Sequence, residues 1–246
     1  MEQDGNFTSL DKIGHETRRK ENVNKAKKIA LGYNLLGFTV PFIAVFLRTN
    51  YAVAIIGILY PLLGVLILYR KYPLIIFWGD DAKNSCPSIG YGFMLSVVSL
   101  LMRAFLDYHI LSFYNTVLPV ICSAVILFIS LYKSGISSSV PKIKIQITAM
   151  AIMSIAYGLG FSALANCVFD FSNPRKYKSS VINAYTTSDK GGPTFHFTIA
   201  AWPGQNSSRD EWVDKQQFSS TPVGSVVEIY QKKGLFNAPW YYVKYR

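Results

Sequence analysis

The sequence predicts a membrane α-helical bundle of about five transmembrane helices, followed by a small all-β C-terminal domain. Half of the 246 residues are apolar and only 16% are charged, below the roughly one quarter typical of soluble domains. Apolar runs long enough to cross a bilayer fill residues 29–171. From about residue 172 the composition changes to Tyr, Val, Thr and turn residues, which is typical of short strands.

The apolar runs predict five spans. Three of them contain 19 to 23 residues without a charge, and about 20 helical residues cross a ~30 Å hydrocarbon core. A fourth carries Arg103 near its end, and the fifth is uncharged but rich in small residues. The predicted spans are about 29–47, 51–69, 87–106, 110–132 and 145–169.

The distribution of Lys and Arg predicts the orientation. Thirteen cations lie in residues 1–28 and in the links on the same side, against one or two in the opposite links. Cations favour the cytoplasmic side, so we expect a cytoplasmic N-terminal tail, whose cluster from Arg18 to Lys28 can lie on anionic membrane lipid. An odd number of spans then places residues 172–246 outside the cytoplasm. We expect a multi-pass protein of the bacterial inner (plasma) membrane. If the segment 87–106 does not cross, the domain moves inside.

Three polar residues, Arg103, Asp107 and His109, interrupt two long apolar runs in "MRAFLDYH". In one interpretation they form the bend between two spanning helices: Arg103 suits a helix C-terminus, Asp107 can cap the N-terminus of the next helix, and the two can pair. In the other they form a polar site at the outer mouth of the bundle, because an ionisable residue within the membrane is a candidate functional residue.

Small residues recur four apart in the last span. Ala156 with Gly160, and Gly158 with Ser162, allow the backbones of two helices to approach closely. This face can pack inside the chain's own bundle or against a second copy in a homo-oligomer.

The C-terminal domain is predicted to contain four or five strands, in an open sandwich or a barrel resembling an OB or SH3-like unit. Alternation is clearest at 194–202, where Phe195, Phe197, Ile199 and Ala201 share one face. The predicted strands are 177–185, 194–202, 225–231 and 240–246, with 211–218 as a shorter strand or a helical turn.

No catalytic motif is found in the sequence. The three cysteines form no C-x-x-C pair, and we expect neither a metal site nor a cofactor. His196 points away from the apolar face of its strand, which indicates a solvated histidine. Asp210, Glu211 and Asp214 indicate a charged turn beside a strand.

The stretch "TPVGSVVEIYQKKGLFNAPWYYV" resembles the closing segment of several uncharacterised bacterial multi-pass membrane proteins. In these a P-x-G turn, a strand and a Gly-x-x-x-x-Pro-Trp ending complete a small β-domain. The resemblance implies architecture only. This chain has Asn237 and Ala238 where a second glycine is expected.

These observations favour a non-enzymatic membrane protein whose external β-domain binds a protein or envelope component. The domain has ten cations, five acids and thirteen aromatic residues, a composition that also occurs in single-stranded nucleic-acid binders. Because we expect the domain outside the cytoplasm, we expect no nucleic acid. The alternatives are a small transporter or channel with a polar outer mouth, and a membrane protein that gives immunity to a toxin.

Overall fold

The computed structural model describes residues 9–46, 51–71, 74–78, 86–135, 143–189 and 191–245. The chain forms two compact units. One comprises Met1–Asp107 and Val117–Leu164, and the other comprises Tyr108–Thr116 and Ala165–Arg246. We call them the helical unit and the β unit. Parts of the predicted tail and links, at 1–8, 47–50, 79–85 and 136–142, lie outside the described residues.

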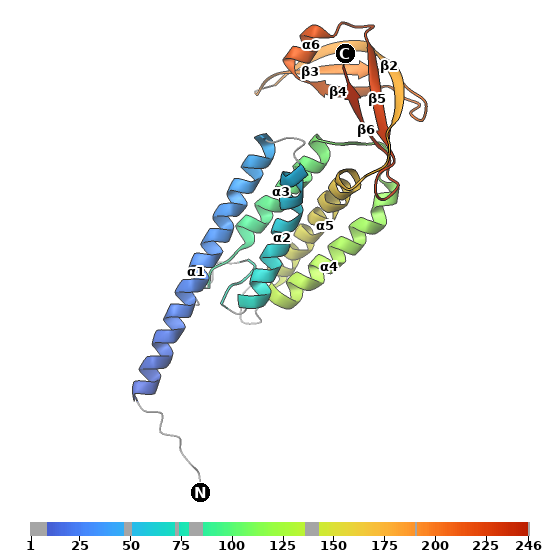
Figure 1. Ribbon diagram of the computed structural model, residues 1–246. Coiled ribbons are helices and arrows are strands. Elements are labelled where there is room, and N and C mark those ends of the chain that lie inside the picture. Colours follow the sequence, from blue (N-terminus) through green and yellow to red (C-terminus); the bar gives the residue numbers. More distant parts are fainter. Residues whose placement is uncertain are drawn as a thin grey trace. The chain divides into compact units, whose positions relative to one another are not determined.

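Five long helices account for most of the helical unit (Figure 1). Within the described residues, three segments are long and apolar enough to cross a membrane: Tyr51–Lys71, Tyr114–Ser134 and Ile143–Val168. The apolar helix that carries Arg103 is shorter, with 17 residues. The helices are α1 (Ser9–Phe46), α2 (Tyr51–Lys71), α3 (Gly90–Leu106), α4 (Val117–Gly135) and α5 (Ile143–Val168).

Glycines allow the helices to approach closely. A Cβ on Gly37 of α1 would lie 2.4 Å from Gly92 Cα of α3. In α5, a Cβ on Gly158 would lie 2.7 Å from the Val120 carbonyl of α4, and one on Gly160 would lie 3.1 Å from Leu100 of α3. Both glycines of the predicted small-residue face therefore lie against helices of the same chain.

The β unit is an antiparallel half-barrel in which the strand order is β1-β6-β5-β2-β3-β4 (Figure 1). The four predicted long strands are present, and the segment 211–218 divides between β4 and α6, where the Asp214 side chain caps the helix by accepting from Gln217 N at 2.7 Å. The elements are β1 (His109–Ile110), β2 (Arg175–Asp189), β3 (Gly192–Ile199), β4 (Arg209–Val213), α6 (Lys215–Ser220), β5 (Val226–Lys232) and β6 (Trp240–Lys244).

The start of the predicted span 110–132 was wrong. Its first residues form β1, which pairs with β6, and a 3-10 turn at Tyr114–Thr116; α4 begins only at Val117. The polar bend therefore contains a strand. The apolar Ile110 and Leu111 contribute to the β unit, where Leu111 N donates to the Pro239 carbonyl. Hydropathy cannot distinguish burial in a β core from burial in lipid.

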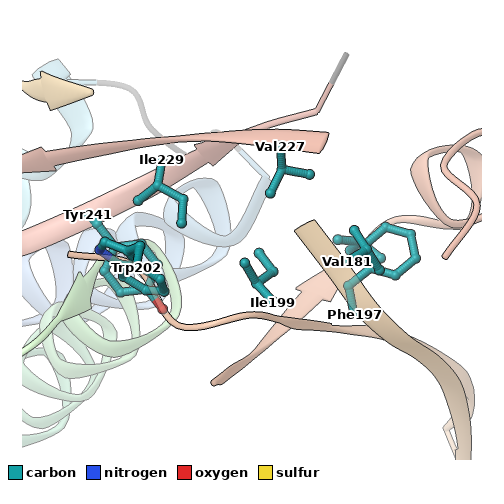
Figure 2. Packing of buried hydrophobic residues seen from close by; sticks show 8 residues of the cluster. Val181, Phe197, Ile199, Trp202, Val227, Ile229 and Tyr241 are labelled. Carbon is teal, nitrogen blue, oxygen red and sulfur yellow. The ribbon is translucent and has the colours of Figure 1, made fainter. Parts of the chain in front are cut away.

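One face of the sheet forms the hydrophobic core of the β unit (Figure 2). Alternation places Phe197 and Ile199 of β3 on this face as predicted, and both are fully buried. Ala201 does not belong to it, because β3 ends at Ile199 and Ala201 is exposed. The buried cluster consists of Val181, Phe197, Ile199, Trp202, Val213, Val227, Ile229 and Tyr241.

The turn between β5 and β6 explains the absence of the expected second glycine. Gly234 and Asn237 both have positive φ, of 81° and 58°. Asparagine tolerates this left-handed conformation better than other side chains with a Cβ, so Asn237 fits this position of the turn. The side chain of Asn166 binds the turn on both sides: it accepts from Phe236 N at 3.0 Å and donates to the Ala238 carbonyl at 2.8 Å.

Candidate functional site

Arg103 and Asp107 form a buried ion pair at the end of α3. Arg103 Nε lies 2.5 Å from Asp107 Oδ2, and both side chains are almost fully buried. Asp107 is the C-cap of α3, with its N–H donating to the Arg103 carbonyl, so the predicted N-cap role for the next helix was wrong. The guanidinium is held by its own i+4 carboxylate, a pairing that suits the C-terminal end of a helix dipole.

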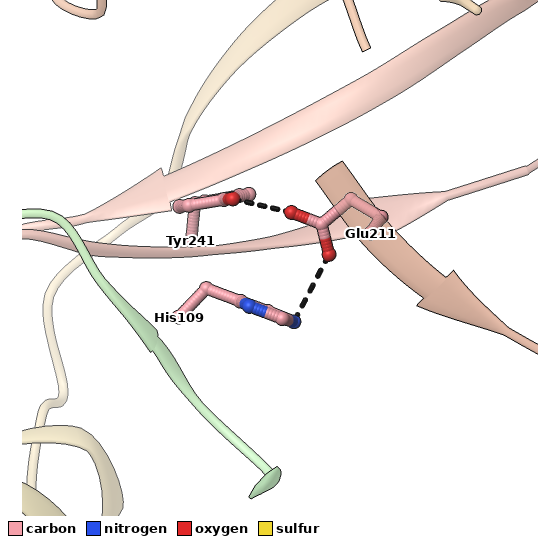
Figure 3. A network of polar contacts seen from close by, with 3 residues as sticks. All are labelled: His109, Glu211 and Tyr241. Carbon is pink, nitrogen blue, oxygen red and sulfur yellow. Dashed lines mark hydrogen bonds and ion pairs between the residues drawn. The ribbon is translucent and has the colours of Figure 1, made fainter. Parts of the chain in front are cut away.

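His109, the third residue of the predicted site, makes its contacts within the β unit (Figure 3). Its Nε2 lies 3.0 Å from Glu211 Oε2. The hydroxyl of Tyr241 donates to the other oxygen of the same carboxylate. The three side chains come from β1, β4 and β6. Glu211 and Tyr241 are buried, whereas the His109 side chain is 40% exposed.

Burial is the main cause of the shifted pKa values of Glu211 and Tyr241. It raises the pKa of Glu211 above its ordinary value, and the neighbouring His109 and the Tyr241 hydroxyl oppose the rise only in part. Burial and the adjacent Glu211 also raise the pKa of Tyr241, so its hydroxyl remains a donor. The arrangement gives the buried carboxyl group of Glu211 a partner for each oxygen, and it links the short strand β1 to β4 through the contact between His109 and Glu211.

The sequence interpretation of Glu211 as part of a charged turn was wrong. Glu211 lies in β4, two residues before the core residue Val213, and therefore on the same face of the strand. Asp210 lies on the opposite, exposed face, where Thr198 donates to it at 2.7 Å. The alternation of β4 relative to Val213 is the signal in the sequence that could have identified Glu211 as an inward carboxylate.

A second carboxylate fixes the turn between β5 and β6. Asp170 Oδ2 accepts from Gly234 N and from Trp240 Nε1, each at 2.8 Å, and Lys232 Nζ donates to the Asp170 carbonyl at 2.6 Å. Burial raises the pKa of Asp170, but hydrogen bonds from Ser172, Gly234 and Trp240 outweigh it and hold the pKa below its ordinary value. Trp240, the tryptophan of the Gly-x-x-x-x-Pro-Trp ending, thus donates a hydrogen bond to a carboxylate of the same chain.

The outward face of β2, β5 and β6 combines lysines with aromatic rings. It lies opposite the core because Val227 and Ile229 of β5 and Tyr241 of β6 point inward, so that their strand neighbours point outward. We call it the basic-aromatic face; it consists of Lys176, Lys178, Glu228, Tyr230, Lys232, Trp240, Tyr242 and Lys244.

Tyr230 is at the centre of this face. Its ring stacks on Tyr242, with centroids 5.1 Å apart and an interplanar angle of 6°. Lys244 Nζ lies 4.8 Å from the Tyr230 centroid, a cation–π distance. Glu228 Oε2 is 2.8 Å from Lys176 Nζ and accepts from the Tyr230 hydroxyl at 2.9 Å. The one carboxylate of the face is therefore buried beneath its partners, and the exposed charge is that of the lysines.

His196 lies on the outward face of β3, as predicted. Its ring stacks on Tyr185 with centroids 5.1 Å apart, and its Nε2 lies 3.1 Å from Thr194 Oγ1. Among the described residues no group of three or more His, Cys, Asp and Glu side chains is placed to hold a metal ion.

Comparisons of the chain with protein families, with curated proteins and with solved structures found no match. The resemblance of the closing segment to other multi-pass membrane proteins therefore stays a prediction. The candidate site is accordingly defined by geometry alone, and Lys176, Lys178 and Lys244 of the basic-aromatic face are exposed.

Proposed function

We propose that this chain is a non-enzymatic multi-pass membrane protein whose β unit binds an anionic polymer of the cell envelope, such as an acidic polysaccharide. The basic-aromatic face is the observation that carries the proposal. It has four lysines and one glutamate, and it presents them around two stacked tyrosine rings. A regular anionic polymer matches this sheet face better than a small molecule does, because a polymer can contact several lysines at once.

The distribution of charge over the face favours a polyanion. Lys176 already pairs with Glu228, and Lys232 donates to the backbone of Asp170. Lys178 and Lys244 are exposed and lie on opposite sides of the Glu228–Tyr230 pair, on β2 and β6. They can therefore bind two successive anionic groups of one chain. The rings of Tyr230 and Tyr242 offer an apolar surface against which sugar rings can pack.

The membrane part of the proposal rests on three helices long and apolar enough to cross a bilayer and on the cation asymmetry. We propose that α1 and α3 cross as well, giving five spans, with the N-terminus in the cytoplasm and the β unit outside it in the inner membrane. Alkaline phosphatase, active only outside, and green fluorescent protein, fluorescent only inside, test this when fused after Arg246. A fluorescent, phosphatase-negative fusion contradicts the topology and favours the single-stranded nucleic-acid alternative.

Binding is tested with the full chain in nanodiscs of neutral lipid, so that the lysines meet only the added polymer. Polygalacturonate is the anionic probe, dextran is the neutral one, and single-stranded DNA tests the alternative. We expect affinity for polygalacturonate that weakens with salt and no affinity for dextran. The double variant Lys178→Gln with Lys244→Gln should weaken binding about tenfold, on the basis of about 0.7 kcal/mol for each exposed charge.

The control variant is Lys215→Gln, which removes one charge that is also exposed, from α6. It should leave the affinity unchanged within about twofold. If the control loses affinity about threefold, which is half of the binding free energy that the double variant loses, net charge rather than the basic-aromatic face is responsible. If DNA binds more tightly than polygalacturonate, the polysaccharide assignment is wrong.

A further inference from the structure

The helical unit contains an apolar groove of about 600 Å³ between α2, α4 and α5. Its walls are two stripes of residues at helical spacing. Leu62, Leu66 and Tyr69 of α2 form one stripe, and Ser123, Ser130 and Ser134 of α4 belong to the other. The groove falls within the 300–1,000 Å³ range of ligand sites.

The serine hydroxyls and the Tyr157 hydroxyl that line the groove already donate to the backbone of the protein. Ser123 and Ser130 donate to carbonyls four residues earlier, each at 2.7 Å. The Tyr157 hydroxyl of α5 donates to the Ile58 carbonyl of α2 at 3.2 Å, which leaves the ring as the apolar side of the groove. With these donors engaged, an apolar chain can lie along the groove without leaving a serine hydroxyl or the Tyr157 hydroxyl unpaired, and Tyr69 is 76% exposed.

One end of the groove is charged. Among the lining residues, all of which the structure describes, Lys133 alone carries a formal charge. It is exposed, in the last turn of α4. Tyr69, near the end of α2, lines the groove too and is 76% exposed. Tyrosine and lysine near helix ends are typical of the headgroup level of a bilayer.

The length of the groove matches one leaflet. Its α4 wall runs from Ser123 to Ser134, which is eleven helical steps or about 16 Å. Half of a ~30 Å hydrocarbon core is about 15 Å. In the proposed topology the C-terminal ends of α2 and α4 both lie at the cytoplasmic surface, so the groove occupies the cytoplasmic leaflet and Lys133 lies at its headgroups.

From this geometry we propose that the groove is a binding site for one anionic phospholipid, with an acyl chain between α2, α4 and α5 and the phosphate at Lys133. The inference rests on the membrane insertion proposed above and is independent of the polymer proposed for the β unit. Charge complementarity selects an anionic headgroup, because the groove presents one cation and no acid. Basic pockets between helices on the cytoplasmic side are typical sites for such lipids.

The test uses the full chain in nanodiscs that contain equal amounts of phosphatidylglycerol and phosphatidylcholine. Native mass spectrometry after ejection from the disc reports which lipid stays bound. We expect one phosphatidylglycerol retained in preference to phosphatidylcholine. Lys133→Gln should reduce this preference about fivefold, the effect expected for one basic residue at the membrane surface. Lys71→Gln is the matched control, since Lys71 also lies in the last turn of its helix but does not line the groove.

A second variant fills the groove and leaves its charge in place. Ile126 of α4 lines the groove and is 66% exposed, so Ile126→Trp can be accommodated without disturbing the core and should abolish retention of both lipids. Equal retention of the two lipids by the unmodified chain, or an effect of Lys71→Gln as large as that of Lys133→Gln, overturns the site. Failure of the unmodified chain to incorporate into bilayers overturns membrane insertion, and this inference with it.

Discussion

The hydrogen bond from Tyr241 to Glu211 can be removed with little other change. In Tyr241→Phe the ring keeps its packing against Trp202 and His109, with centroids 5.0 and 5.2 Å apart. Only the hydroxyl that donates to the buried carboxylate is lost. Glu211 is 3% exposed, so water cannot replace the donor at that oxygen, and His109 remains as its other partner.

The cost follows from the charge and the burial of the acceptor. A hydrogen bond to a charged group contributes about 1.5–3 kcal/mol, and we expect a loss of about 2 kcal/mol in the free energy of unfolding of the β unit. That unit has about 90 residues, for which 1 kcal/mol shifts Tm by about 4–8 °C. The unfolding temperature should therefore fall by about 8–16 °C.

Thermal unfolding of the full chain in detergent, followed by tryptophan fluorescence, measures this effect, because three of the four tryptophans lie in the β unit. The control is Tyr242→Phe, in which the neighbouring ring stays stacked on Tyr230 on the outward face. It should change the free energy by less than about 0.5 kcal/mol. Equal unfolding temperatures for Tyr241→Phe and the unmodified chain would refute the reasoning that this bond holds a buried carboxylate.

Three further predictions follow from single positions. The folded state raises the pKa of Glu211 above its ordinary 4.5. The contribution of Glu211 to stability should therefore be fully present below pH 4.5 and be lost as the pH rises through the pKa of the folded state. Urea unfolding midpoints measured between about pH 4 and 8 should show this loss in the unmodified chain and not in Glu211→Gln. Asn237→Gly should leave the unfolding temperature of the β unit unchanged, whereas Asn237→Val should cost about 2 kcal/mol, because valine is strained at a φ of 58°. Gly37→Ala should destabilise the helical unit by about 1–3 kcal/mol in thermal unfolding, because the added Cβ would lie 2.4 Å from Gly92 Cα. Gly32→Ala on the same helix should be neutral, because the space around Gly32 is open. An equal loss of stability in both variants would contradict close packing as the cause.

The sequence predicts the elements whose pattern is local. The long strands β2, β3, β5 and β6 have alternation or turn residues at their ends, and each was predicted within a few residues of its observed bounds. The helices of the predicted spans were placed equally well where no charged residue interrupts the predicted range, as in α2 and α5. In both cases the signal lies within a single window of the chain, so a pattern read along the sequence is sufficient.

Contacts between distant segments could not be predicted in this way. β1 is only His109–Ile110, and its partner Tyr241 lies more than 130 residues away in the chain. Nothing in "DYHILSF" distinguishes a strand that pairs across this distance from the first turn of a spanning helix. Glu211 is a different case, because its parity with Val213 placed it on the inward face, but the local cluster of acids favoured a turn.

The basic-aromatic face shows the same division between local and distant information. Alternation along β5 and β6 predicts that Glu228, Tyr230 and Tyr242 point away from the core. They lie next to Lys176 only because β5 lies between β6 and β2 in the sheet. A strand order of this kind has no local sequence signal.

The origin of β1 determines what constitutes the β unit. The segment 172–246 does not form the sheet alone, because the link between α3 and α4 supplies the strand that covers the edge of β6. An uncovered edge presents unpaired backbone donors and acceptors, and loss of His109 would leave the buried Glu211 with Tyr241 as its remaining partner in the cluster. The bend that carries the polar residues of "MRAFLDYH" is thus divided between the two units. Arg103 and Asp107 form an ion pair at the C-terminal end of α3. His109, two residues later, lies in the strand that pairs with β6, and its side chain contacts Glu211.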